Sequence, residues 1–198
     1  SGGSGATLNA ADNGFTSVFY YSNSIYSDYP SIGVTLNNMI NPNLDAKLPV
    51  LLGLRYGDEG HAVVCDGYGY NGSTLYHHLN MGWYGQEDVW YNLPNVDSGP
   101  YDTISSCVYN IYISGGGEII SGRVTDVNDA PIEGVTVTAT GAYSDTTDSN
   151  GIYALVGADS GESFTVSASK APYVFADQYV TTGTSSDGGS VSGNVWQV

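Results

Sequence analysis

A run of one serine and three glycines, Ser114–Gly117, divides the 198-residue chain into two stretches whose patterns differ. Glycine weakens the interiors of helices and strands, so such a run marks a connection rather than an element. The stretch before the run ends in alternating residues typical of a strand, and the stretch after it begins a new alternating series. We therefore predict two small domains, 1–114 and 115–198.

The first stretch predicts helices followed by strands. Apolar residues recur at helical spacing within 6–20. A second helix is expected over 35–40, ending near Pro42 because proline interrupts a helix. Segments rich in β-branched and aromatic residues then predict strands over 48–54, 60–67, 73–79, 89–93 and 104–113. Helices first and strands after them indicate an α+β fold.

The second stretch predicts strands throughout. Its apolar residues alternate with polar ones, and turns rich in glycine, asparagine and aspartate separate the segments. The spacing of these segments fits a small all-β sandwich. The expected strands cover 119–125, 134–140, 151–155, 163–169, 178–180 and 193–198.

The charge balance excludes several classes of function. Lys and Arg total 4 against 20 for Asp and Glu, giving a formal net charge of −16. Nucleic acids and anionic membranes are bound by clustered cations, so we expect neither as a partner. No apolar stretch reaches the roughly 20 residues of a membrane span.

The start of the sequence and its composition both indicate a secreted protein. Ser1–Gly5 is rich in glycine and serine and has neither the basic nor the apolar segment of a signal peptide, so we interpret the chain as a processed product or a fragment. An acidic composition also suits an extracellular protein. In that setting Cys65 and Cys107 form either one disulfide or two buried thiols.

The residues that carry chemistry lie between Leu48 and Leu93. A thiol nucleophile needs a base beside it, and an imidazole held in a strand, such as that of His61, can serve. An asparagine on the adjacent strand can accept the other imidazole N–H and set the orientation of the ring. A hairpin separates His61 from Asn80, so we expect the two to meet, with Trp83 shielding their hydrogen bond from water.

This arrangement resembles the streptopain family, secreted bacterial cysteine peptidases with a papain-like fold. Gly60–Val63 matches the family's Gly-His-Ala-Phe/Val strand. His78–Trp83, followed by Gly85, matches its His-Val-Asn-Trp-Gly-Trp-Gly motif. The resemblance covers roughly residues 1–113, the C-terminal, mostly β half of that fold. It implies that His61 is the catalytic base, that Asn80 orients it, and that Trp83 belongs to the wall of the site.

Two departures from the family's pattern limit what this chain does alone. The family has tryptophan directly after the asparagine, where this chain has Met81. The family's nucleophilic cysteine lies far upstream, in a segment absent here. Cys65 cannot replace it, because four residues of extended strand put it about 13 Å from His61 at ~3.3 Å per residue. Cys107 lies in a late strand and not at a helix N-terminus, where a thiolate is favoured. We therefore expect the chain to be inactive alone.

The order of segments in the second domain resembles the carboxypeptidase regulatory-like sandwich, a transthyretin-like accessory module of secreted proteins. The resemblance rests on 119–126, 130–137 and 147–155. It implies a fold and leaves the ligand open. Attachment, spacing or contact between subunits is the expected role of this domain.

The sequence contains partial patterns for two metal sites and favours neither. Asp145, Asp148 and Asn150 form part of a calcium-loop pattern, but the closing glutamate is missing and a hairpin turn is the better interpretation. The pair His77-His78, with Asp66 or Cys65, fits no known spacing of zinc ligands. We expect no metal and no cofactor.

Three functions remain open from the sequence. In the first, the chain supplies His61 and Asn80 to a cysteine peptidase that cleaves proteins or peptides, and a missing N-terminal protease segment is its partner. In the second, it is a non-catalytic extracellular subunit that assembles with copies of itself into an oligomer or filament. Surface rich in tyrosine would mark that interface: Phe19-Tyr20-Tyr21, Ile25-Tyr26 and Tyr29. In the third, it is a surface-binding module.

Overall fold

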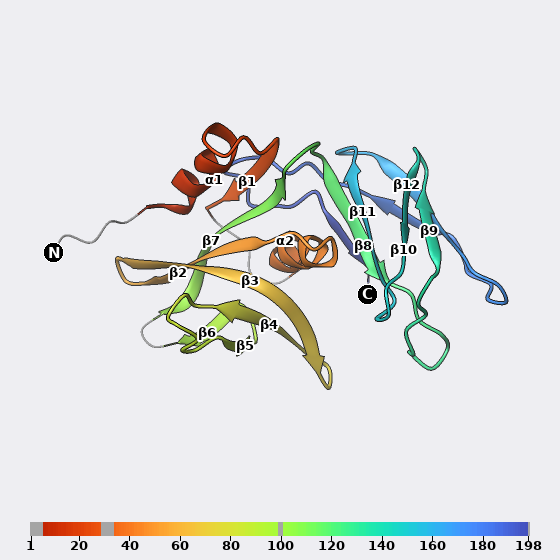
Figure 1. Ribbon diagram of the computed structural model, residues 1–198, viewed down its shortest axis with the longest axis horizontal. Helices are drawn as coiled ribbons and strands as arrows, with labels where there is room; N and C mark the ends of the chain where they lie inside the picture. Colours follow the sequence, from red (N-terminus) through yellow and green to blue (C-terminus); the bar gives the residue numbers. More distant parts are fainter. Residues whose placement is uncertain (1–5, 29–33, 99–100, 198) are drawn as a thin grey trace.

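The computed structural model describes residues 6–28, 34–98 and 101–197. It confirms an α+β first domain followed by an all-β sandwich (Figure 1). The strands of the first domain form one sheet in the order β1-β7-β2-β3-β4-β5, with β6 paired to β7. The elements of this domain are α1 Leu8–Ser17, β1 Asn23–Ser27, α2 Val34–Asp45, β2 Val50–Tyr56, β3 Glu59–Asn71, β4 Thr74–Asn80, β5 Val89–Tyr91, β6 Asn95–Ser98 and β7 Tyr101–Tyr112.

The two helices cover opposite faces of this sheet. Successive side chains of a strand point to opposite faces, and β2 shows the result directly. Leu52 belongs to the main core beneath α2, whereas its neighbour Leu51 packs in a smaller cluster beneath α1. Both faces near the middle of the sheet are therefore buried, which explains the nearly continuous apolar sequence of β2.

Helix α1 forms where its sequence favours a helix start. The Thr7 hydroxyl caps the helix by accepting the backbone N–H of Ala10 at 3.1 Å. Leu8, Ala11 and Phe15 lie three and four residues apart and contact the same cluster on the sheet. The helix ends at Ser17, before the exposed Phe19.

The prediction that the second helix ends near Pro42 is wrong, because α2 runs on to Asp45 with Pro42 inside it. Proline cannot donate to the carbonyl four residues earlier, which belongs to Asn38. The Ser192 hydroxyl of the second domain donates to that carbonyl at 3.3 Å instead. A partner distant in the sequence thus stabilises the longer helix.

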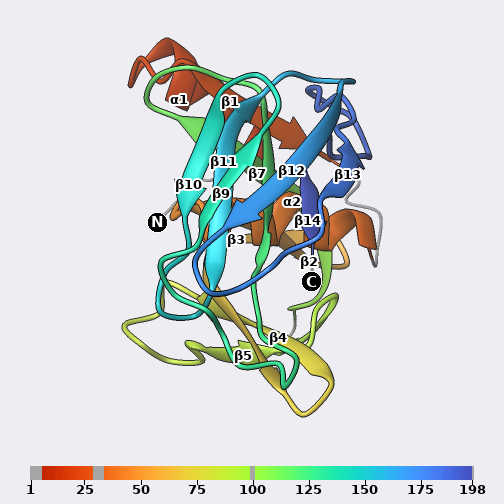
Figure 2. The same ribbon diagram turned by 90° about the vertical axis from the view of Figure 1, so that its right-hand side faces the viewer.

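The second domain consists of two facing sheets around one core (Figure 2). One sheet has the order β10-β9-β12-β13, and the other has the order β11-β8-β14, with β14 parallel to β8. Strands β1, β6 and β10 have no counterpart among the strands predicted from the sequence. The elements of this domain are β8 Glu118–Arg123, β9 Thr136–Ala139, β10 Tyr143–Thr146, β11 Ile152–Ala158, β12 Ser163–Ser169, β13 Gln178–Thr181 and β14 Val195–Gln197.

Asn110, on β7, is the centre of a buried polar joint between the domains. Its carboxamide oxygen accepts from the side chains of Asn43 at 3.1 Å and Asn194 at 2.9 Å. Its carboxamide nitrogen donates to the Gly117 carbonyl at 3.2 Å. Asn43, Asn110 and Asn194 are each fully or almost fully buried. Because buried amides are costly unless paired, these bonds couple the two domains.

Asp45 forms a second contact between the domains. Its carboxylate accepts from the Tyr68 hydroxyl and, across the interface, from the Ser121 hydroxyl, both at 2.7 Å. Burial raises the pKa of Asp45 to about 6, although both hydrogen bonds oppose the shift. The folded protein therefore binds a proton at Asp45 more readily than the unfolded chain does. This contribution to stability is present below pH 4 and is lost as the pH rises through 6.

We expect Asp45→Asn to remove this pH dependence. As the pH rises from 4 to 7, the natural chain should lose about 2 kcal/mol of folding stability that the variant keeps, allowing for partial solvent screening. Urea unfolding at several pH values measures the difference. Asp97→Asn, at an exposed position, is the matched control and should show no such trend. A pH-independent difference for Asp45→Asn would contradict the burial account.

Candidate functional site

His61 is held at the start of β3 by the hairpin that β3 forms with β2. It pairs with Leu54, and paired residues on adjacent strands share a face of the sheet. The Leu54 side chain is buried in the core on the α2 face. The imidazole of His61 therefore lies on that face, where Trp83 and Tyr101 border the core.

Contacts on three sides fix the ring of His61. It stacks on Trp83, with ring centroids 4.7 Å apart and planes 23° apart. It also stacks on Tyr101, with centroids 5.4 Å apart. Its Nε2 atom lies 2.7 Å from the carbonyl oxygen of Met81. A carbonyl only accepts, so Nε2 carries the proton and Nδ1 of the neutral ring has a free lone pair.

The structure does not join His61 to Asn80. Asn80 pairs with Val64, three residues further along β3 than His61, so the two side chains point to opposite faces of the sheet. The Asn80 carboxamide oxygen instead accepts the backbone N–H of Gly82 at 2.9 Å. The carbonyl of Met81 occupies the orienting position that the sequence assigned to Asn80.

Asp88 fixes the strand end that carries this carbonyl. Its carboxylate accepts the backbone N–H of Met81 at 2.7 Å. The Met81 side chain is fully buried, and Gly82 adopts a φ of +74°, which glycine tolerates best. The backbone of Met81 is thus bonded to Asp88 at its N–H and to His61 at its carbonyl. Nothing in the spacing of Asp88 or Tyr101 signals these contacts in the sequence.

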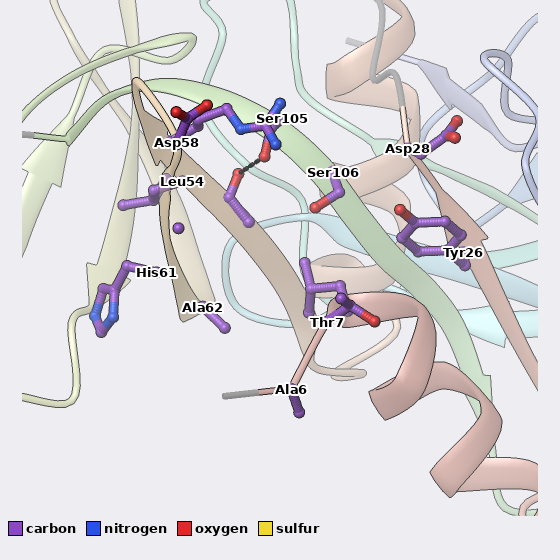
Figure 3. A pocket seen from close by; sticks show the side chains of 14 residues that line it. Ala6, Thr7, Tyr26, Asp28, Leu54, Asp58, His61, Ala62, Ser105 and Ser106 are labelled. Atoms are coloured by element: carbon purple, nitrogen blue, oxygen red, sulfur yellow. Dashed lines mark hydrogen bonds between the residues drawn. The ribbon is translucent and has the colours of Figure 1, made fainter. Parts of the chain in front are cut away.

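A cavity of about 600 Å³ lies next to β2 and β3, on the face that α1 covers (Figure 3). Thr7, Leu54, His61 and Ser106 are among the residues that line it, and the side chains of Leu54 and His61 extend from the strands to the side away from Thr7 and Ser106. Gly53 fits the close approach of the strands here, because a Cβ at this position would clash with the Ser106 hydroxyl. The cavity and the ring of His61 therefore belong to different faces of the sheet.

Comparison with known families finds a match within each part of the chain. Residues 1–91 match the peptidase C10 family, and residues 119–189 match the carboxypeptidase regulatory-like domain. The peptidase C10 match, which is to the streptopain family, ends within the first domain, and the regulatory-like match lies within the second. No curated protein and no solved structure matches it.

Neither cysteine of the chain is suited to be a catalytic nucleophile. Cys65 and Cys107 are free thiols and are completely buried. Burial raises the pKa of Cys65 to about 12 and that of Cys107 well above its ordinary value. A nucleophile must be an accessible thiolate, which both environments oppose. The structure therefore shows Cys65 and Cys107 as two buried thiols, which is one of the two alternatives left open by the sequence.

The other candidate residues form ordinary structural contacts. Asp148 accepts the backbone N–H groups of Asn150 and Ile152 at 2.8 and 3.0 Å, as expected of a hairpin turn. His77 is buried against Asn41 at 2.7 Å, and burial lowers its pKa to about 4. Within the described ranges, no three metal-binding side chains cluster, and neither helix is long and apolar enough to cross a membrane.

Proposed function

We propose that the first domain is the histidine-bearing portion of a secreted cysteine peptidase. His61 serves as general base to a thiol that this chain does not itself carry. The observation that supports this role is the fixed imidazole, whose Nε2–H is bound to the Met81 carbonyl, so that Nδ1 of the neutral ring carries the lone pair that accepts a proton. The peptidase-family match to residues 1–91 implies a protein or peptide substrate.

The ring can perform both proton transfers of such a reaction. Nδ1 takes the proton of the thiol, and the resulting thiolate attacks the carbonyl carbon of the substrate to form a carbon–sulfur bond. The Met81 carbonyl stabilises the imidazolium through the Nε2–H bond. Nδ1 then returns the proton to the leaving amine as the peptide bond breaks. Water, activated by the same nitrogen, hydrolyses the thioester and restores the thiol.

Alkylation of the whole gene product tests this proposal. Iodoacetamide should abolish peptide hydrolysis, and the modified residue should map to a cysteine outside these 198 residues. Cys65 and Cys107 should stay unmodified in the folded protein because both are buried. Hydrolysis that survives complete alkylation, or inactivation that maps to Cys65, would overturn the assignment.

Asp88 is expected to act as a positioning residue through the Met81 peptide. Asp88→Ala removes the acceptor for the Met81 N–H and should lower kcat about tenfold, with little change in KM. Asp88→Asn keeps an acceptor oxygen and should restore most of the rate. Nitrogen chemical shifts of His61 report its tautomer, and only the Ala variant should lose the single Nε2–H form. Equal kinetics and shifts in both variants would contradict this role.

One observation favours a second candidate, a non-catalytic subunit that assembles with copies of itself. Val18, Phe19 and Tyr20 follow α1 and are 62%, 68% and 84% exposed, forming apolar surface at one end of the first domain. Tyr21, Ile25 and Tyr26, from the same predicted interface, are partly buried against the domain's own cores. Tyr29 lies outside the described residues.

A further inference from the structure

The segment that joins β4 to β5 forms a closed loop beside His61. Its first residue, Met81, supplies the carbonyl bonded to the imidazole, and its last residue, Asp88, accepts the Met81 backbone N–H at 2.7 Å. Between them Gln86 pairs with Trp83, and the Gln86 backbone N–H donates to the Trp83 carbonyl at 3.1 Å. The loop is therefore held both at its base and at its middle.

Tyr84 and Gly85 are the two central residues of the turn that the Trp83–Gln86 bond closes. Their φ angles are +57° and +83°, both positive as in a type I′ turn. Such turns favour the pair Asn-Gly, because a bulky side chain is strained at positive φ. The streptopain motif has glycine directly after its second tryptophan, where this chain has Tyr84. The chain thus places a large side chain where the backbone favours a small residue.

No local contact explains this conformation of Tyr84. Tyr20 and Lys47 also have positive φ angles, but they follow the ends of α1 and α2, where such a residue commonly terminates a helix. Tyr84 follows no helix. Its side chain is 106% exposed, so no part of the described chain covers it or offsets the strain. Strain of this kind is typical of functional sites.

Trp83 connects Tyr84 to the candidate site. The rings of Trp83, His61 and Tyr101 contact one another, and the centroids of Trp83 and Tyr101 are 6.2 Å apart. The Cα atom of Tyr84 lies about 3.8 Å from that of Trp83. A substrate whose peptide bond meets the His61 ring extends by at most ~3.6 Å per residue on either side. The residues next to that bond therefore lie within reach of the Tyr84 ring.

The turn presents an apolar surface without charge. Its four residues, 83–86, carry no ionised side chain at neutral pH. Removing an aromatic ring and an apolar side chain from water together is favourable, and a large ring buries more area than other side chains do. The hydrogen-bonded turn also lowers the entropy cost of the contact. This surface favours a large apolar side chain of the substrate over a charged one.

We propose that Tyr84 determines part of the substrate specificity of the candidate site by packing its ring on a large apolar side chain close to the cleaved bond. The inference rests on the peptidase proposal and names its substrate class, peptides with leucine or phenylalanine near that bond. Tyr84 takes no part in the proton transfers, so its loss changes which peptides are selected and leaves the chemical step intact.

Hydrolysis of matched peptides by the whole gene product tests this role. Internally quenched peptides differ at one residue, which is leucine, phenylalanine, alanine or arginine, scanned over the three positions on each side of the cleaved bond. Tyr84→Asn restores the favoured Asn-Gly turn without the ring. It should lower kcat/KM for the preferred leucine or phenylalanine peptide about tenfold and leave that for the alanine peptide within about twofold. Tyr84→Phe keeps the ring and should keep the preference.

Thermal unfolding separates this role from a structural one. Tyr84→Asn relieves the strained φ and should raise the Tm by about 2–4 °C while the preferred peptide is cleaved more slowly. A residue that only supports the fold would lose stability and rate together. Ala142→Gly relieves a positive φ in the second domain and is the matched control, with kcat/KM expected to stay within about twofold for every peptide.

The outcomes distinguish this inference from the peptidase proposal. Absence of hydrolysis in the natural protein, or hydrolysis that survives His61→Gln, overturns the peptidase proposal and this inference with it. If His61→Gln abolishes hydrolysis, the role of Tyr84 alone is overturned by an unchanged ratio of leucine to alanine cleavage in Tyr84→Asn. A lower Tm in that variant, or a ring-dependent preference for arginine, overturns it as well.

Discussion

Replacing His61 with glutamine is expected to lower kcat/KM of the whole gene product by about 10²–10⁴-fold, the usual contribution of a positioned acid–base group. Glutamine can donate to the Met81 carbonyl as Nε2–H does, but it has no nitrogen that accepts a proton at neutral pH. The folded structure should therefore persist while the proton transfers fail. Hydrolysis of a fluorogenic peptide, with unfolding measured in parallel, separates the two effects.

His78→Gln is the matched control. His78 is partly exposed, and its ring pairs with Asp66 at 2.6 Å on the opposite face of the sheet. Its replacement removes a surface contact with a carboxylate, which contributes at most about 1 kcal/mol to stability, and should leave kcat/KM within threefold. A loss in His61→Gln no larger than that in His78→Gln would remove His61 from the mechanism.

Asn110→Ala is expected to destabilise both domains by roughly 3–5 kcal/mol. The change removes the carboxamide oxygen to which the side chains of Asn43 and Asn194 both donate in a buried joint. It also places alanine at a φ of +50°, a conformation that asparagine tolerates better. Urea unfolding followed by tryptophan fluorescence and circular dichroism measures the loss. Both signals should change in a single transition, because the joint couples the domains.

Asn110→Gly separates the two causes of that loss. Glycine tolerates the positive φ, so the difference between the Ala and Gly variants measures backbone strain, expected to be about 1 kcal/mol. Asn150→Ala, at an exposed turn, should change stability by less than 0.5 kcal/mol, as roughly expected for surface positions. Two separate transitions in the natural chain, or a loss below 1 kcal/mol in Asn110→Ala, would contradict the coupling.

Local sequence patterns predicted most of the sheet and both helices. The apolar run in β2 and the Asn71-Gly72 turn after β3 each carry a local signal, and the expected segments overlap the observed strands. The extent of α2 could not be predicted, because the partner of the freed Asn38 carbonyl is Ser192, more than 150 residues away. Strand β1 is short and lacks regular alternation, and it forms by pairing with β7.

The candidate site was predictable in part. The motif around His61 predicted a strand that carries the imidazole, and Trp83, expected to shield a His61–Asn80 hydrogen bond, stacks on the His61 ring instead. It did not predict that a backbone carbonyl orients the ring, because every residue has a carbonyl and no sequence pattern marks its direction. The register of β3 and β4 places Asn80 on the other face, and register depends on pairing rather than composition. The catalytic roles of His61, Asn80 and Trp83 stay predictions.

Native size and inhibitor labelling of the material isolated from its source test the central claim most directly. If His61 serves a thiol from elsewhere, a second, tightly bound component or segment should carry a cysteine that reacts with an epoxide inhibitor of cysteine peptidases. That labelling should vanish in His61→Gln. A single species near 20.8 kDa under denaturing conditions that forms large assemblies natively and takes up no inhibitor would contradict the peptidase account. It would leave a self-assembling structural subunit.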